Sequence, residues 1–317
     1  MAYACVQLGF VGLGRMGGNM VHRIKRDSAH EVVAFDFAAE AVERAVGVGA
    51  IGAATLDELV EQLDAPRQVW VMVPAGEATS ETVEKLAGLL SPGDTIIDGG
   101  NSRWSDDKAR AAELEPRGIN YVDVGTSGGV WGLDVGYCMM VGGPDESVAR
   151  LAPILDVLAP PTTEEHGPGW GHMGPVGSGH YVKMVHNGVE YALMQAYAEG
   201  FNLFDACEYE LDNAKIAHLW MQGSVVRSWL CELAALAFEQ EGNDLGELEP
   251  VVADSGEGRW TLEDATDKRV PVPTIAMSLF ERYASQSHAD FANKVNAALR
   301  AQFGGHRLGQ RVDALSE

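Results

Sequence analysis

The stretch Val11-Gly12-Leu13-Gly14-Arg15-Met16-Gly17 follows a short apolar run near the N-terminus and opens an amphipathic segment. It predicts a tight turn between a strand over residues 6–11 and a helix over residues 14–26. Glycines at this spacing allow the turn itself, the close approach of a pyrophosphate, and the packing of the helix on the strand. The first N–H groups of the helix then suit an anion. We therefore predict a dinucleotide site lined by Gly12, Leu13, Gly14, Arg15, Met16 and Gly17.

The pattern around this turn continues as apolar runs that alternate with amphipathic segments, which is typical of strand and crossover-helix units in a parallel sheet. Strands are expected at residues 6–11, 32–35, 68–73, 95–98, 120–123 and 137–141. Helices are expected at residues 14–26, 39–46, 56–62, 80–89, 105–115 and 145–158. We predict that residues 1–177 form a doubly wound α/β domain of the Rossmann type.

The second half of the chain has a different pattern. Residues 160–179 are rich in Gly and Pro, and strand-like alternation stops after them. One long helix is expected over residues 181–206, followed by helices near residues 212–231, 233–241, 274–285 and 290–300. The predicted fold is therefore an α/β domain followed by an all-α domain over residues 178–317.

Composition excludes several classes of function. The chain of 317 residues has 23 Lys plus Arg against 46 Asp plus Glu, a formal net charge of -23 that would repel nucleic acid. No apolar run has the length of about 20 residues that a membrane span requires. The N-terminus does not resemble a signal peptide, and the four cysteines lie far apart. We expect a cytoplasmic protein with reduced thiols that binds neither nucleic acid nor membranes.

Asp36 follows the second predicted strand, 24 residues after Gly12. A carboxylate at this position accepts hydrogen bonds from the adenosine ribose and repels a 2′-phosphate. No Lys or Arg follows directly to neutralise such a phosphate, so we predict NAD as the cofactor rather than NADP. The alternative is that Asp36 is an ordinary turn residue.

The long helix carries a polar stripe. Lys183, Asn187, Glu190 and Tyr191 stand at i, i+4, i+7 and i+8, which places them on one helix face. The alternative is a solvated face, but the opposite side, with residues such as Val182, Val189 and Leu193, is predicted to supply the packing. A Lys and a Glu on one wall of a cleft could form an acid/base pair for dehydrogenation without a metal.

Two other features have more than one interpretation. His166, His172, His180 and His186 lie close together in sequence but lack metal-site spacing, so we expect loop or substrate-binding histidines and no metal. Residues 125–129, Gly-Thr-Ser-Gly-Gly, are predicted to form a loop after the fifth strand. This loop could present backbone N–H groups to a carboxylate, and a tight structural turn explains its glycines equally well.

Four motifs together resemble 6-phosphogluconate dehydrogenase, the decarboxylating enzyme of the pentose phosphate pathway. They are the glycine-rich turn at residues 12–19, Ile97-Asp98-Gly99-Gly100-Asn101-Ser102, Thr126-Ser127-Gly128-Gly129, and the block from Gly179 to Tyr191. The last is the most specific, because β-hydroxyacid dehydrogenases share the glycine-rich turn. The resemblance extends almost to the C-terminus.

The resemblance implies a role for each matching position. Lys183 would be the base during hydride transfer and then the acid that assists decarboxylation, and Glu190 would protonate the enediol. The residues implied to hold the substrate carboxylate and hydroxyls are Asn101, Ser127, Gly128, Gly129, His186 and Asn187. Those implied near the substrate phosphate or in the C-terminal tail are Tyr191, Arg259, Arg282, Arg300 and His306. In the family the tail reaches a partner subunit, so a homodimer or homotetramer is expected.

The chain departs from the long members of this family. It lacks their Asn-Arg-Thr sequence after the second strand, and it has Val73-Pro74-Ala75-Gly76 where they have a Lys near the cofactor; we expect Val73 and Asn101 to contact the cofactor. It resembles the short, NAD-preferring branch. One alternative is another β-hydroxyacid dehydrogenase, acting on 3-hydroxyisobutyrate or tartronate semialdehyde, and a second is a dinucleotide-binding regulator without turnover.

Overall fold

The computed structural model describes residues 5–163, 167–286 and 290–304. The chain divides into two compact units, Met1–Asn187 and Gly188–Glu317, which we call unit 1 and unit 2. The division falls inside one long helix. The domain boundary expected between residues 177 and 178 stays a prediction; it coincides with the first residue of this helix, Ser178.

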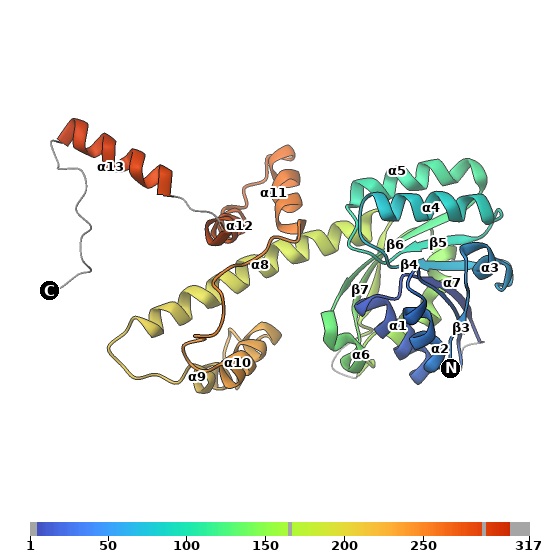
Figure 1. Ribbon diagram of the computed structural model, residues 1–317, viewed down its shortest axis with the longest axis horizontal. Coiled ribbons are helices and arrows are strands. Elements are labelled where there is room, and N and C mark those ends of the chain that lie inside the picture. The colour runs from blue at the N-terminus through green and yellow to red at the C-terminus, as the bar shows by residue number, and fades with distance from the viewer. Residues whose placement is uncertain (1–4, 164–166, 287–289, 305–317) are drawn as a thin grey trace. The chain divides into compact units, whose positions relative to one another are not determined.

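Unit 1 is built on a twisted sheet, which has eight strands within the described residues, in the order β3-β2-β1-β4-β5-β6-β7-β8 (Figure 1). The strands are β1 Gln7–Val11, β2 Glu31–Phe35, β3 Ile51–Gly52, β4 Gln68–Val71, β5 Thr95–Asp98, β6 Asn120–Ser127, β7 Cys138–Gly142 and β8 Trp170–Gly174. Every neighbouring pair is parallel except β6 and β7.

Helices cover both faces of this sheet (Figure 1). They are α1 Arg15–Asp27, α2 Ala39–Gly47, α3 Leu56–Glu61, α4 Glu77–Leu89, α5 Trp104–Leu114, α6 Gly132–Val135 and α7 Asp145–Leu158, with short 3₁₀ turns at Glu115–Arg117 and Gly129–Trp131. One buried apolar cluster joins the sheet to α1, α2 and α7, and a second joins it to α3, α4 and α5. The predicted doubly wound α/β fold is confirmed.

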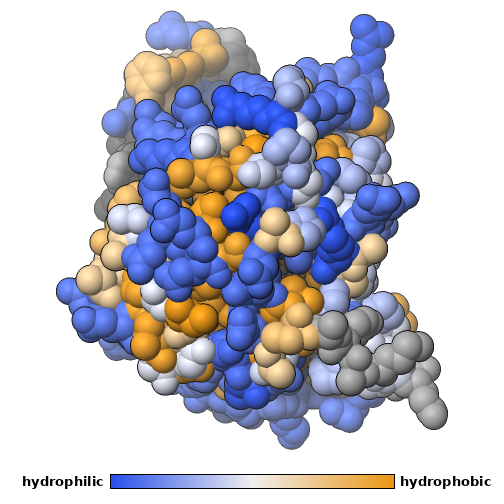
Figure 2. Space-filling view, turned by 90° about the vertical axis from the view of Figure 1, so that its right-hand side faces the viewer, coloured by the Kyte–Doolittle hydropathy of each residue, from blue (hydrophilic) through white to orange (hydrophobic). Residues whose placement is uncertain are grey.

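Alternate residues of each strand enter opposite clusters, as the two-residue period of a strand requires. In β2, for example, Val32 and Ala34 belong to the first cluster while Val33 and Phe35 belong to the second. The apolar runs of the sequence are therefore strands buried on both sides. Apolar side chains also reach the surface of unit 1: the end that carries α3 and β3 shows apolar groups set among polar ones (Figure 2).

The sheet differs from the prediction in three ways. The short strands β3 and β8 were not expected, since β3 has two residues and β8, Trp-Gly-His-Met-Gly, has no β-branched residue. Strand β6 runs on to Ser127, so residues 125–127 are strand and not loop. Strand β7 is antiparallel to β6 because residues 128–137 are too few for a full crossover.

Unit 2 is helical within the described residues. Its elements are the later part of α8 Ser178–Asp205, then α9 Asn213–Trp220, α10 Trp229–Glu241, α11 Glu257–Asp267, α12 Pro273–Gln286 and α13 Asp290–Gly304. The helix expected over residues 212–231 is wrong, because the chain turns at Gly223 (φ 80°) and Ser228 caps a new helix by accepting a hydrogen bond from the backbone N–H of Cys231. Helix α11 was not expected, because its first turn contains glycine.

The apolar core of unit 2 is small. Phe201, Ala217, Cys231 and Ala235 form its buried cluster, where α8, α9 and α10 meet. Within the described residues, none of the helices combines the length and the hydropathy needed to cross a lipid bilayer.

Candidate active site

The glycine-rich turn has the conformation that its sequence predicts. Gly12 has φ 94°, and a Cβ there would lie 2.4 Å from the carbonyl oxygen of Met72; a Cβ on Gly17 would lie 2.0 Å from the carbonyl oxygen of Gly12. Gly14, at the start of α1, has open space around it. No side chain caps α1, and its first turn holds no acidic residue. The N–H groups at the start of α1 are therefore available to an anion.

Asp36 faces this turn from the end of β2. Its Oδ2 accepts a hydrogen bond of 2.6 Å from the backbone N–H of Leu13, and its Oδ1 accepts one of 2.8 Å from that of Ala38. Asp36 is thus a turn residue, and it also lines a cavity of about 300 Å³ beside Gly12 and Gly14. The two interpretations of this carboxylate are compatible.

The same cavity tests the other predicted cofactor contacts. Val73 lines it, whereas the Leu13 side chain belongs to the apolar core and Met16 packs against that core. Arg15 is exposed. Lys85 of α4 also lines the cavity, and sequence reasoning missed it because it lies 49 positions after Asp36.

The first turns of α8 lie directly on β6. Asp123, Gly125 and Ser127 alternate along this strand and therefore share one face of the sheet. The Asp123 carboxylate accepts hydrogen bonds from the backbone N–H groups of Gly177 (2.6 Å) and His180 (2.8 Å), at the start of the helix. A Cβ on Gly125 would lie 2.4 Å from the Cβ of Lys183. The Lys183 stem thus lies above Gly125, on the strand face that carries Ser127.

Lys183 points its ammonium at a buried amide. Its Nζ donates a hydrogen bond of 2.7 Å to Oδ1 of Asn187, and Nδ1 of His186 lies 3.0 Å from the same oxygen. Cys138 pairs with Ser127 across β6 and β7. Burial raises the pKa of its thiol, and the charge of Lys183 partly offsets that rise, so the thiol is near this ammonium. The structure therefore gathers Ser127, Lys183, His186 and Asn187 in unit 1.

Other predicted unit 1 contacts follow two neighbouring strands. Asn101 is exposed in the loop after β5, and Gly128 (φ 130°) and Gly129 (φ 53°) follow Ser127 directly at the end of β6. Those two backbone conformations favour glycine. Ligands of open α/β sheets bind outside the carboxyl ends of the strands, which is where these residues stand.

The predicted packing of α8 is wrong in part. The apolar residues Val182, Val189 and Leu193 are exposed, while Asn187 and Tyr191 of the polar stripe are 8% and 3% exposed. Hydrogen bonds explain the reversal, because a buried polar side chain costs little once it is paired. The alternative of a solvated polar face is therefore excluded for Asn187 and Tyr191.

In unit 2, Tyr191 joins α8 to the segment before α11. Its hydroxyl contacts Oδ1 of Asp254 (3.1 Å) and Oγ of Ser255 (3.0 Å), and it accepts a hydrogen bond from the Ser255 backbone N–H. The Arg282 guanidinium lies 3.4 Å from the centre of the Tyr191 ring. Burial raises the pKa of Tyr191, so the phenol stays protonated near neutral pH.

Two predicted phosphate-binding arginines belong to the same region. Arg282 Nη1 donates to the carbonyl oxygen of Ala253, and the charge of Arg259 acts on Tyr283 next to Arg282. Glu190 lies on α8 directly before Tyr191 and is half-buried. Arg300 lies on α13, its side chain is outside the described part of the structure, and His166 and His306 lie outside the described residues.

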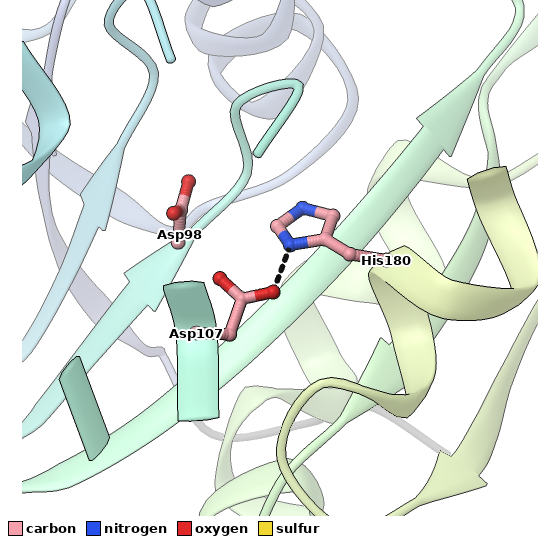
Figure 3. Close-up of side chains that lie close together, drawn as sticks. All are labelled: Asp98, Asp107 and His180. Atoms are coloured by element: carbon pink, nitrogen blue, oxygen red, sulfur yellow. Dashed lines mark hydrogen bonds and ion pairs between the residues drawn. The ribbon is translucent and has the colours of Figure 1, made fainter. Parts of the chain in front are cut away.

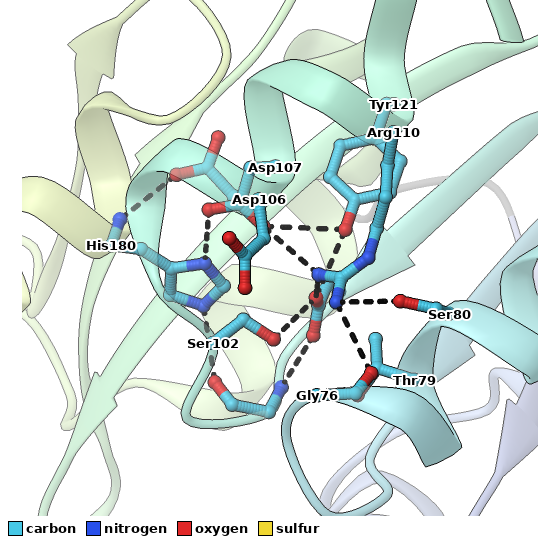
Figure 4. A network of polar contacts seen from close by, with 12 residues as sticks. Gly76, Thr79, Ser80, Ser102, Asp106, Asp107, Arg110, Tyr121 and His180 are labelled. Carbon is cyan, nitrogen blue, oxygen red and sulfur yellow. Dashed lines mark hydrogen bonds and ion pairs between the residues drawn. The ribbon is translucent and has the colours of Figure 1, made fainter. Parts of the chain in front are cut away.

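Sequence reasoning missed a buried network beside Asn101. Asp98 at the end of β5, Asp107 of α5 and His180 of α8 are almost fully buried and lie close together (Figure 3). Nδ1 of His180 is 2.7 Å from Oδ2 of Asp107. Arg110 Nη1 and the Tyr121 hydroxyl donate to Oδ2 of Asp98, at 3.2 and 2.9 Å (Figure 4).

The side chains of these three residues could hold a metal ion, and their mutual distances would permit it. The network already contains the positive charge that its carboxylates need, however, because Arg110 lies within 4 Å of both Asp98 and Asp107. Burial alone lowers the pKa of His180, but Asp107 outweighs it, with weaker help from Asp98 and Asp123, and raises that pKa to about 9. An imidazolium is thus a second cation here, and a metal is not required.

The fold and these residues together define an NAD-binding dehydrogenase. The chain belongs to the 6-phosphogluconate dehydrogenase family: residues 7–167 match the NAD binding domain of 6-phosphogluconate dehydrogenase, and residues 179–311 match its C-terminal domain.

Individual relatives agree with this assignment. The chain is 46% identical over 309 residues to the NAD(+)-dependent, decarboxylating 6-phosphogluconate dehydrogenase of Haloferax volcanii, covering 97% of this chain and 100% of that protein. The structure of Plasmodium falciparum 6-phosphogluconate dehydrogenase has a TM-score of 0.80 and 26% identity, over 97% of this chain and 67% of that one. Mycobacterium tuberculosis 3-hydroxyisobutyrate dehydrogenase, with a TM-score of 0.70 and 22% identity over 90% of this chain and 96% of that one, shares the fold alone.

Proposed function

We propose that this chain catalyses the NAD-dependent oxidative decarboxylation of 6-phosphogluconate to ribulose 5-phosphate, carbon dioxide and NADH. The observation that carries the proposal is the position of Lys183, above Gly125 and hydrogen-bonded to the buried Asn187. It lies on the same strand face as Ser127, outside the carboxyl end of the sheet. The likeness to the Haloferax volcanii enzyme over its full length supports the substrate and the cofactor.

Lys183 is the residue that exchanges protons with the substrate 3-oxygen throughout the proposed reaction. As a neutral amine it takes the proton of the substrate 3-hydroxyl while the hydride leaves the same carbon; bound NAD supplies the hydride acceptor. The carboxylate then leaves as carbon dioxide, and its bonding electron pair forms an enediolate whose oxygen Lys183 protonates. Glu190, seven residues further along α8, then protonates the carbon that lost carbon dioxide, while the enediol hydroxyl gives its proton back to the neutral Lys183 amine and becomes the ketone of ribulose 5-phosphate.

The remaining predicted residues divide between two ends of the substrate. We assign the carboxylate and hydroxyls to Asn101, Ser127, Gly128, Gly129, His186 and Asn187. We assign the phosphate to Tyr191, Arg259, Arg282, Arg300 and His306, because guanidinium groups bind phosphate with charge-assisted hydrogen bonds. The Tyr191 hydroxyl donates to Asp254 in this structure, so phosphate binding would require it to exchange that acceptor.

A homodimer or homotetramer is part of the proposal. Unit 2 exposes large apolar side chains such as Leu203, Leu219 and Phe291, at 71%, 66% and 77%. Exposed apolar groups of this number mark surfaces that other protein covers. We also propose a cytoplasmic location, which agrees with the four free cysteines.

The test is initial-rate oxidation of 6-phosphogluconate by the purified protein, with NAD and NADP in parallel and carbon dioxide release followed in the same sample. NADH formation with an equal amount of carbon dioxide supports the proposal. Oxidation of 3-hydroxyisobutyrate with NAD, or reduction of tartronate semialdehyde with NADH, together with no reaction of 6-phosphogluconate, would replace it with the related dehydrogenase activity.

A further inference from the structure

We propose that His180 is a positioning residue, which holds the loop carrying Asn101 in register with Lys183 through one imidazole ring. The inference rests on the proposed function and extends it, because His180 is three residues before Lys183 on α8 and touches the loop residue that precedes Asn101. The two nitrogens of the ring have different partners.

The first partner fixes the ring itself. Nδ1 of His180 lies 2.7 Å from Oδ2 of Asp107, which comes from α5. The Tyr121 hydroxyl contacts the other oxygen of Asp107 at 3.3 Å. Asp107 is fully buried and His180 is 2% exposed, so water does not compete for these contacts. A buried carboxylate–imidazole pair of this kind orients the ring.

The second partner is the loop. Nε2 of His180 lies 3.0 Å from the carbonyl oxygen of Gly100, and because a carbonyl can only accept, Nε2 carries a proton. Asp98 also holds this loop: its Oδ1 accepts a hydrogen bond from the Gly100 backbone N–H, and its Oδ2 accepts one from the Ser102 hydroxyl. Asn101 is therefore held between two residues whose positions the network determines.

The α8 side of the connection is rigid. The backbone N–H of His180 donates to Asp123, and a Cβ on Gly179 would lie 2.4 Å from the carbonyl oxygen of Met140. One helical turn separates His180 from Lys183. A shift of the His180 ring would thus change the distance between the Asn101 loop and the Lys183 amine, and a misplacement of about 1 Å can cost about 100-fold in rate.

The two nitrogens allow a sharp test with two variants. In His180→Gln the amide nitrogen occupies the place of Nε2 and keeps the donor to Gly100, whereas in His180→Asn it occupies the place of Nδ1 and keeps the contact with Asp107. We expect His180→Asn to lower kcat about 100-fold and His180→Gln to lower it less than about tenfold.

A matched control separates positioning from stability. Asp94 and Asp98 flank the same strand, β5, and Asp94 is equally buried but pairs with Arg67 at the opposite end. Asp94→Asn should lower the melting temperature without changing kcat. If His180→Asn lowers the melting temperature as Asp94→Asn does, while its kcat stays within about threefold of the parent, His180 is only structural and the inference is wrong.

A readout without turnover keeps the inference separate from the proposed function. Hydrogen exchange of the amides of residues 99–103 should become faster in His180→Asn than in His180→Gln. If the parent does not oxidise 6-phosphogluconate, the proposed function fails while this comparison still decides the role of His180. If neither variant folds, Asp107→Asn tests the same ring through the partner of Nδ1: faster exchange of residues 99–103 supports the inference, and unchanged exchange contradicts it.

Discussion

Unit 1 and unit 2 differ in how they hold functional side chains. Unit 1 has two large apolar clusters on the two faces of its sheet, and a buried polar network at the carboxyl end of that sheet. Unit 2 has a cluster of four buried residues, and many of its large apolar side chains face solvent. The sheet of unit 1 is covered on both faces and buries its apolar residues within one chain, whereas the helices of unit 2 leave many of theirs exposed.

This difference indicates which functional residues a single copy of the chain holds in place. Asp36, Ser127 and Lys183 lie on strands, turns and a helix start that unit 1 fixes by itself. Tyr191, Arg259 and Arg282 lie in a unit with little core of its own. We infer that unit 1 binds the cofactor and holds the base without help, and that unit 2 needs a second copy of the chain to complete its packing.

The largest expected effect is the loss of the base in unit 1. Lys183→Met should lower turnover of 6-phosphogluconate by about 10³-fold or more, because general base catalysis contributes up to about 10⁴-fold. The affinity for NADH, measured by fluorescence titration, should not change. The exposed Lys215→Met is the control, with the parent rate expected. A Lys183→Met protein that keeps a tenth of the rate would show that another group takes the proton.

Core substitutions test the contrast in packing directly. Ile97→Ala removes a fully buried side chain of β5 and should cost about 2–5 kcal/mol of the free energy of unfolding in urea. Leu203→Ala, at a residue that is 71% exposed, should cost less than about 0.5 kcal/mol in a monomer. An equal cost for both, together with a concentration-dependent transition, would show that Leu203 is covered in an assembly.

Substrate recognition in unit 2 is the next test. Arg282→Ala should raise the KM for 6-phosphogluconate about 10- to 100-fold with little change in kcat, since a charged hydrogen bond contributes about 1.5–3 kcal/mol. The KM for NAD should stay the same. Arg227→Ala, an exposed arginine of the same unit, serves as the control. A change in the cofactor KM instead would contradict the separate roles of the two units.

Cofactor recognition in unit 1 gives a smaller effect. Asp36→Asn should lower kcat/KM with NAD by about tenfold, because an amide accepts ribose hydrogen bonds less well than a carboxylate. It should raise kcat/KM with NADP. Lys85 lines the same cavity, and once the negative charge of Asp36 is removed, no carboxylate at that position opposes its attraction for the 2′-phosphate. Glu40→Gln, in the first turn of α2, is the control. If NADP use does not rise, Lys85 does not reach the 2′-phosphate.

The last prediction concerns the pH dependence of stability. The pKa of His180 is raised from 6.5 to about 9 in the folded protein, so the native state binds this proton more tightly than the unfolded chain. The stabilisation is complete below about pH 6.5 and is lost as the pH rises towards about 9. The melting temperature should therefore fall over this range, and less steeply in His180→Gln. Equal slopes in parent and variant would mean that His180 does not carry the charge.

The sequence by itself determined the class of fold, and it predicted the principal site residues. Buried strands of a parallel sheet are continuous apolar runs, and the glycines of the turn are required by contacts within a few residues, so both are visible in local sequence. The helical periodicity that placed Lys183, Asn187, Glu190 and Tyr191 on one face of a helix is likewise visible in local sequence. The strands β3 and β8 were missed because short strands owe their hydrogen bonds to neighbouring strands, and the helix α11 was missed because its first turn contains glycine.

Only the tertiary structure decided which face of α8 is buried, and that His180 connects Asp107 with Gly100. Asp98, Asp107, Asp123 and His180 come from four elements that are up to 82 residues apart in the chain, and each alone is an ordinary polar residue. Their chemistry depends on burial and on one another, since a carboxylate or imidazole away from water must find its partner charge or hydrogen bond nearby. Such a partner is a property of the fold, which no local pattern reports.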